Sequence, residues 1–125
     1  MIAVSFNGVR EEVGSIDDFG MALDRYDGVA RFELWLSQVP EGPSLCMLRN
    51  GEHAFLMYLR FREDSGFVSQ GASAMEDEAE YVLSNGQVDV YPMAWCIPVE
   101  QCYQALAYFF VNDGLRPEFV AWHES

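Results

Sequence analysis

Residues 45–61 read LCMLRNGEHAFLMYLRF, and this stretch decides the fold. Asn50-Gly51 divides it, and Asn-Gly favours the positive φ angles of a two-residue hairpin turn. The flanking segments 45–49 and 53–61 are therefore predicted to be antiparallel strands. Both faces of 53–61 are largely apolar: His53, Phe55, Met57, Leu59 and Phe61 alternate with Ala54, Leu56, Tyr58 and Arg60. This pattern predicts a central strand that is covered on both sides.

Further strands are predicted on both sides of this hairpin. Residues 31–36 (RFELWL) alternate between apolar and mixed faces, which is typical of a half-buried strand. Asn7-Gly8 and Asn85-Gly86 are two more hairpin signals, and they join 2–6 to 9–13 and 81–83 to 87–91. Short strands are predicted at 67–69 and 119–122, and a loop at 71–74.

Two segments have helical periodicity. Residues 16–26 repeat apolar side chains at helical spacing after the potential cap Ser15. A second helix is predicted from Pro98 at its first position to Gly114 just past its end, with a wide apolar stripe that includes Phe109. We therefore expect one α+β domain over residues 1–125: a single antiparallel sheet with hairpins and two main helices, the C-terminal helix packed on the sheet.

The chain is strongly acidic. Its 125 residues include twenty Asp and Glu but only seven Arg and no Lys, for a formal net charge of −13. Such a surface repels nucleic acid and anionic membranes and attracts basic proteins, although acidity also serves solubility alone. The N-terminus lacks a secretory pattern, and no apolar run approaches the roughly 20 residues of a membrane span. The expected location is the cytoplasm.

No constellation of residues indicates catalysis or metal binding. The five possible ligands, His53, His123, Cys46, Cys96 and Cys102, have no zinc-type spacing, and the cysteines read as buried reduced thiols. Cys46 and His53 flank the same turn, so a nucleophile pair is an alternative, but no third group is evident to orient it. We expect no enzymatic activity, no metal and no cofactor.

The order of segments along nearly the whole chain resembles the Imm1 family of immunity proteins from bacterial polymorphic toxin systems. The early helix 15–26 and the strand 31–36 begin the resemblance. It continues through residues 42–45, 56–59, 67–74 and Tyr81. The closing part is a helix with Ala105 and Phe109-Phe110, followed by Gly114-Leu115-Arg116-Pro117, Val120 and Trp122. The resemblance implies a small cytosolic antitoxin that acts in interbacterial competition and has no catalytic motif.

The resemblance also implies a partner. The segment FVSQGASA (residues 67–74) is similar to one in immunity proteins against a DNA cytidine deaminase toxin. The expected function is therefore to bind a cognate toxin, a deaminase with a basic substrate groove, and to occlude its active site or groove. Two alternatives stay open: a small-molecule-binding or enzymatic α+β domain with a pocket near Tyr58 and His53, and an acidic protein–protein adaptor.

The expected toxin-binding residues lie mainly in the most acidic part of the chain. Loops on a rigid sheet commonly carry recognition residues, and residues 63–89 hold the densest negative charge. The run from Glu76 to Glu80 is expected in a variable loop, where the alternative is a solvated segment that touches nothing. The candidate partner-binding residues are Tyr58, Glu63, Asp64, Glu76, Asp77, Glu78, Glu80 and Asp89.

Overall fold

The computed structural model describes residues 2–71, 77–83 and 85–124. Within them the elements run in the order β1 (Ile2–Phe6), β2 (Val9–Glu11), α1 (Ile16–Asp27), β3 (Arg31–Gln38), β4 (Ser44–Asn50), β5 (His53–Leu59), β6 (Phe67–Ser69), β7 (Glu78–Val82), β8 (Val88–Pro92), the 3-10 turn η1 (Met93–Trp95), α2 (Val99–Val111) and β9 (Trp122–Glu124). The described strands form a seven-stranded sheet, β2-β1-β3-β4-β5-β6-β9, and a separate two-stranded sheet, β7-β8. The predicted α+β class is confirmed.

Local sequence signals explain the first hairpin and helix. Asn7 and Gly8 have φ angles of 50° and 82°, as a type I′ turn requires, and they join β1 to β2. Ser15 caps α1, because its hydroxyl accepts a hydrogen bond from the backbone N–H of Asp18 at 3.1 Å. The predicted helix is confirmed, and its last residue is Asp27.

The large sheet is built around β3, β4 and β5. The predicted hairpin is confirmed, but its turn is shifted by one residue: Asn50 pairs with His53 as the last residue of β4, and the turn consists of Gly51, whose φ is 63°, and Glu52. Every described strand pair is antiparallel. Strand β5 ends at Leu59 and not at Phe61 as expected, because the backbone N–H of Arg60 donates to the carboxylate of Asp64 in place of a ladder bond.

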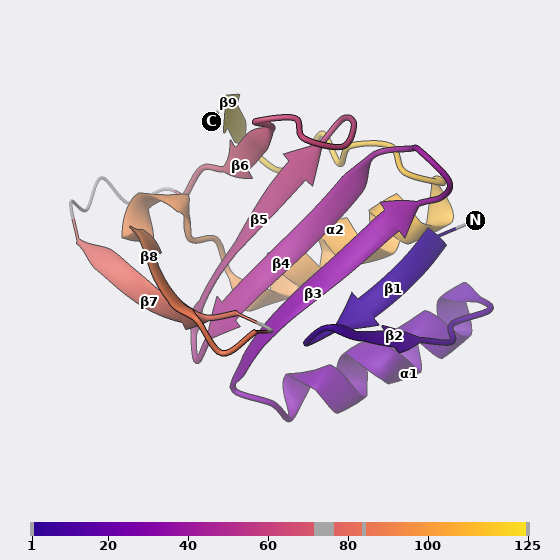
Figure 1. Ribbon diagram of the computed structural model, residues 1–125, viewed down its shortest axis with the longest axis horizontal. Coiled ribbons are helices and arrows are strands. Elements are labelled where there is room, and N and C mark those ends of the chain that lie inside the picture. Colours follow the sequence, from indigo (N-terminus) through magenta and orange to yellow (C-terminus); the bar gives the residue numbers. More distant parts are fainter. Residues whose placement is uncertain (1, 72–76, 84, 125) are drawn as a thin grey trace.

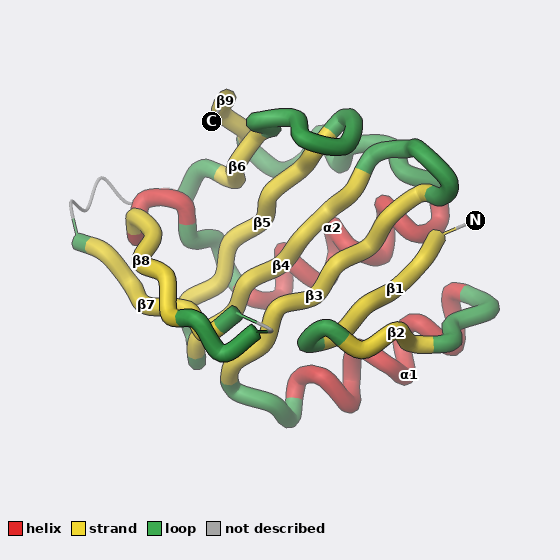
Figure 2. The backbone as a smooth tube through the Cα atoms, in the orientation of Figure 1, coloured by secondary structure: helices red, strands yellow, loops and turns green. Residues whose placement is uncertain are grey.

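The two helices cover one face of the large sheet, as Figures 1 and 2 show. The core on this side joins side chains of β1, β3, β4 and β5 to both helices. Phe19 of α1 stacks on Phe110 of α2 with ring centroids 4.8 Å apart, and the fully buried Phe109 lies edge-on to Tyr58 of β5. The predicted packing of the C-terminal helix on the sheet is confirmed.

The opposite face of the sheet is partly covered by β7 and β8, which we call the ribbon (Figure 1). Phe55 of β5 is the centre of this second core, because its ring lies 5.0 Å from Tyr81, 5.0 Å from Tyr91 and 5.5 Å from Trp95. The amide of Asn50 also donates to the backbone carbonyl of Glu80 at 2.6 Å. Strand β5 is therefore covered on both sides, as predicted, but the cover on this side is a separate small sheet that the sequence did not indicate.

Several boundaries differ from the prediction. Glu78 and Glu80 lie in strand β7 and not in a loop. The alternate residues of this strand, Ala79 and Tyr81, are buried in the second core, so the two glutamates point to the other side. The final strand is Trp122–Glu124, not 119–122, because the indole of Trp122 donates to the Pro117 carbonyl and the preceding residues form turns. Pro98 is the cap of α2, which begins at Val99.

Two further expectations concern the state of the cysteines and the presence of a membrane-spanning helix. Cys46, Cys96 and Cys102 are free thiols; Cys46 and Cys102 are buried as expected, whereas Cys96 is only partly buried. Neither helix in the described part of the chain is long and apolar enough to cross a bilayer.

The substitution Phe109→Ala is expected to destabilise the fold. Phe109 is fully buried, and truncation of such a residue typically costs about 3–5 kcal/mol, which lowers the melting temperature by roughly 10 °C or more. Thermal melting followed by circular dichroism measures this. The control is Val111→Ala on the same helix, because Val111 is 62% exposed. An unchanged melting temperature in the Phe109 variant would contradict its place in the core.

Candidate functional site

Tyr58, the aromatic candidate, lies in the core. Its side chain is on the helix-covered face of the sheet, it is 8% exposed, and its hydroxyl donates to the Gly114 carbonyl at 2.9 Å. This bond connects β5 to the turn that follows α2. His53 is exposed at the other end of β5, on the opposite face, so the two side chains do not line one pocket.

Glu63 and Asp64 lie in the loop that follows β5. Arg60 holds Asp64 with two hydrogen bonds, from Nε to Oδ2 at 2.8 Å and from Nη2 to Oδ1 at 2.9 Å. This guanidinium, with the backbone N–H of Arg60, keeps the pKa of Asp64 well below its usual range. Glu63 is exposed and borders a groove of about 660 Å³ that also includes Trp35 and Phe61. Asp64 is thus part of the loop's own structure, and Glu63 is open to solvent.

The ribbon holds the other described candidates. Asp77 precedes β7, Glu78 and Glu80 lie on β7, and Asp89 lies on β8, while Glu76 falls outside the described residues. Asp77, Glu78 and Glu80 are exposed. Asp89 lies opposite the buried Tyr81 across the two strands. The Asp89 carboxylate accepts hydrogen bonds from the Gln87 amide at 2.8 Å and the Tyr91 hydroxyl at 3.3 Å.

The structure therefore separates the candidates into two surface groups. The loop with Glu63 lies at the Leu59 end of β5, whereas the ribbon covers the His53 end (Figure 1). Of these two groups, the ribbon is the one that brings several exposed, described candidate carboxylates together. The sequence holds no Arg or Lys between Arg62 and Arg116, but the fold places Arg31 of β3 beside Val82, Leu83 and Gly86 at the turn end of the ribbon.

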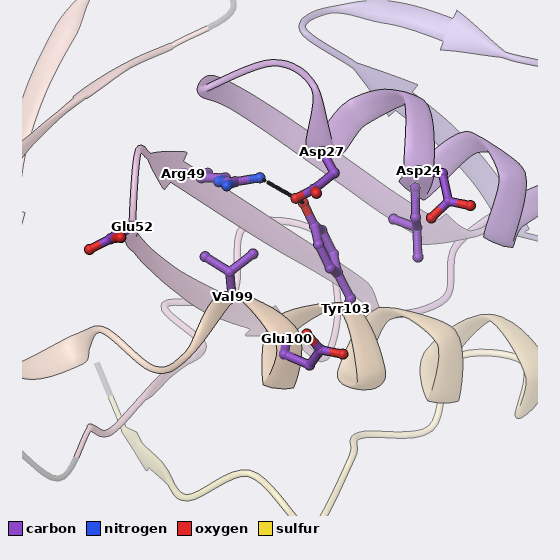
Figure 3. Close-up of a pocket in the computed structure, with 8 residues that line it drawn as sticks. Asp24, Asp27, Arg49, Glu52, Val99, Glu100 and Tyr103 are labelled. Carbon is purple, nitrogen blue, oxygen red and sulfur yellow. Dashed lines mark hydrogen bonds and ion pairs between the residues drawn. The ribbon is translucent and has the colours of Figure 1, made fainter.

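A second acidic surface involves residues that the sequence analysis did not single out. A cleft of about 510 Å³ lies between the end of α1, the β4–β5 turn and the start of α2 (Figure 3). We call it the acidic cleft, and its lining residues are Leu23, Asp24, Asp27, Arg49, Glu52, Val99, Glu100 and Tyr103. Three elements far apart in the sequence supply these carboxylates, so the only local signal was the i, i+3 spacing of Asp24 and Asp27.

Arg49 connects the side chains at the base of the acidic cleft through hydrogen bonds. Its Nη1 donates to Asp27 at 2.7 Å and to the Tyr103 hydroxyl at 2.8 Å, and that hydroxyl donates to Asp27 at 2.8 Å. The hydrogen bonds from Tyr103 and Arg49 keep the pKa of Asp27 below its ordinary value. Burial and the bond to Asp27 raise the pKa of Tyr103. This triad links α1, β4 and α2, so we assign it a structural role.

The remaining polar groups do not form a catalytic arrangement among the described residues. Cys46 pairs across the strands with Met57, not with His53, and burial raises the pKa of its thiol. A buried thiol with a raised pKa is a poor nucleophile. In residues 2–71, 77–83 and 85–124, no three His, Cys, Asp or Glu side chains gather as a possible metal site.

Loss of the Asp27 charge is expected to weaken the triad in a pH-dependent way. Asp27→Asn should lower the free energy of unfolding at neutral pH by less than about 1 kcal/mol, because the carboxylate is largely exposed. A depressed pKa stabilises the fold above the ordinary aspartate pKa of about 4, and this contribution disappears as the pH falls through the folded-state value.

Urea unfolding of wild type and Asp27→Asn should therefore show a difference at pH 7 that becomes smaller as the pH falls below the ordinary aspartate pKa of about 4. Asp24→Asn is the matched control, since Asp24 lines the same cleft but does not accept the Arg49 and Tyr103 hydrogen bonds. A difference that keeps the same size as the pH falls would contradict this account of the triad.

Comparison with known proteins identifies the family. The model of the family described as immunity protein Imm1 matches residues 7–124, which is nearly the whole chain, and confirms the resemblance seen in the sequence. A search of curated proteins finds no match. An immunity protein acts on a cognate toxin, and the acidic, exposed ribbon is a surface of this molecule that a protein partner can reach. The chain therefore belongs to the Imm1 family and is an immunity protein.

Proposed function

We propose that this immunity protein neutralises a nucleic-acid deaminase toxin, one that acts on DNA cytidines, by binding over its active site or substrate groove. Membership of the Imm1 family supports a toxin as partner. The similarity of residues 67–74 to a segment of immunity proteins against a DNA cytidine deaminase supports this toxin class. The inhibitor acts stoichiometrically and in the cytoplasm, where it meets the toxin, and it performs no chemistry itself.

The observation that carries the proposal is the exposed acidic surface of the ribbon. Glu78 and Glu80 of β7, and Asp77 just before it, are open to solvent, and the two-stranded sheet packs on the main sheet through its other face. Grooves that bind single-stranded nucleic acid are usually basic and follow the phosphate backbone. A carboxylate-bearing surface can occupy such a groove in place of phosphates. The ribbon is thus suited to compete with the nucleic-acid substrate for the groove.

The other candidate residues have different places in the proposal. Glu63 is exposed at the opposite end of β5, so we propose it as a peripheral contact that adds to the attraction of a basic partner. Asp64, Asp89 and Tyr58 form hydrogen bonds within the chain, and we propose that they maintain the fold and do not touch the toxin.

The first test is inhibition of the toxin domain encoded by the neighbouring open reading frame. Cytidine deamination of a single-stranded DNA oligonucleotide should fall in proportion to added inhibitor and stop near a 1:1 molar ratio. Added oligonucleotide should slow complex formation, because both compete for the groove. A toxin that binds this protein but shows no deaminase activity would contradict the toxin class. Unaltered deamination at a large excess of inhibitor would contradict the inhibitory function.

The second test asks whether ribbon carboxylates contact the toxin. The triple variant Asp77→Asn, Glu78→Gln and Glu80→Gln should bind several-fold more slowly, with a flatter salt dependence, if these residues attract a basic partner. Surface plasmon resonance at about 0.05 and 0.2 M salt measures both rates. If one carboxylate instead forms a buried ion pair, dissociation should accelerate, at a cost of about 2–5 kcal/mol.

The control removes the same charge from the acidic cleft: Asp24→Asn, Glu52→Gln and Glu100→Gln. Both triple variants change the net charge equally, so a general effect of acidity would affect them alike. The ribbon variant should lose more association rate than the cleft variant. Equal rates for the ribbon variant and wild type at both salt concentrations would leave its acidity as a solubility device. A larger loss in the cleft variant would move the interface to the cleft.

A further inference from the structure

The outward face of the ribbon also carries exposed valines. Register places Val82 opposite Val88, Glu80 opposite Val90 and Glu78 opposite Pro92. The alternate residues Ala79, Tyr81 and Tyr91 point to the second core, so these three cross-strand pairs share the face that points away from it. One end of this face is apolar and the other end is acidic.

These valines are more exposed than the valines inside the large sheet, while Val9 on the edge strand β2 is 64% exposed. Val88 is 52% exposed and Val90 is 51% exposed, whereas Val4 and Val68 in the large sheet are 1% and 2% exposed. Single exposed apolar side chains are common on protein surfaces. Here two lie on alternate positions of one strand, beside Val82 on the neighbouring strand, and form a continuous apolar strip next to Glu80.

The ribbon holds this strip in a defined position. Behind it, Tyr81 and Tyr91 pack their rings against each other and against Phe55 of the main sheet. The backbone carbonyl of Glu80 accepts the Asn50 amide, and the carbonyl of Asp77 accepts the N–H of Met93. A preorganised surface loses less conformational entropy on binding than a mobile one. The outward face is therefore suited to be the centre of an interface.

We propose that the toxin binds this face with an apolar patch that adjoins Arg or Lys side chains, the patch covering Val88 and Val90 and the cations meeting Glu78 and Glu80. This inference rests on the proposed function and specifies the partner surface for the same site. Charge complementarity carries it, because both carboxylates are exposed and neither forms an ion pair with an Arg side chain of the described residues. Interfaces combine an apolar centre with a polar rim, and the two ends of this face match that composition.

A second copy of this chain is a poorer occupant of the face. Each copy brings Glu78 and Glu80 to the contact and a formal net charge of −13 overall, so self-association places like charges near one another. A basic partner gains attraction at the acidic end and removes the valines from water at the other end. The two occupants differ in a measurable property, the oligomeric state of the inhibitor without toxin.

The test is the double variant Val88→Thr and Val90→Thr, measured against the toxin domain by surface plasmon resonance. Threonine keeps the branched shape and the strand preference of valine but adds a hydroxyl, which weakens an apolar contact. The expected result is a Kd raised about tenfold or more through faster dissociation, with the association rate and its salt dependence unchanged. The complementary variant Glu78→Gln and Glu80→Gln should mainly lower the association rate.

Val111→Thr is the matched control, since Val111 is 62% exposed on helix α2 behind the sheet, and it should bind as wild type does. Melting curves check the fold. If the double variant has a clearly lower melting temperature than wild type, the single variants Val88→Thr and Val90→Thr are measured instead. Wild-type binding with an unchanged Kd in the valine variants would overturn the inference and leave the proposed function intact. A wild-type dimer that the variant dissociates, with toxin affinity unchanged, would also overturn it. Failure of the wild-type chain to bind the toxin would contradict the proposed function itself.

Discussion

Strand β5 is apolar on both faces, and each face must be covered separately. Leu56 and Tyr58 require the layer that α1 and α2 supply, while Phe55 on the other face requires a second layer. The ribbon is that second layer, and without it Phe55 and the neighbouring Cys46 and Leu48 of β4, all now buried, would face water. The three-layer arrangement at this end of the sheet follows from this one strand, and so does the position of the ribbon.

The position of the ribbon links stability to recognition. Its inward residues complete the second core, so its outward residues lie on a fixed support although β7 and β8 pair with no strand of the large sheet. In a two-stranded ribbon the side chains alternate between the two sides, which lets adjacent positions have different roles. Tyr81 is 1% exposed and packs on Phe55, while its neighbour Glu80 points to solvent. A structural element that is needed for folding thus also presents the proposed toxin-binding face.

The acidic residues of the chain have two different environments. Asp27 and Asp64 are engaged by Arg49 and Arg60, and both have lowered pKa values, so their charges are used to hold helices and loops together. Glu78 and Glu80, in contrast, form no ion pair with an Arg side chain of the described residues. This difference separates carboxylates that maintain the fold from those available to a basic partner. It also explains why charge density along the sequence, which treats all of them alike, is a coarse guide to an interface.

The sequence by itself determined the hairpin at Asn50-Gly51, both helices, the burial of Phe109 and the two-sided cover of β5, because turn chemistry and hydrophobic periodicity are local properties. Family membership was also readable from the order of its segments. Sequence did not show that Glu78 and Glu80 are strand residues, since their strand depends on Tyr81 packing against Phe55, more than twenty positions away. Tertiary structure likewise separated Glu63 from the ribbon, placed Tyr58 in the core and assembled the acidic cleft from three elements. The physical reason is that a surface is formed by side chains brought together through long-range packing, which local patterns do not encode.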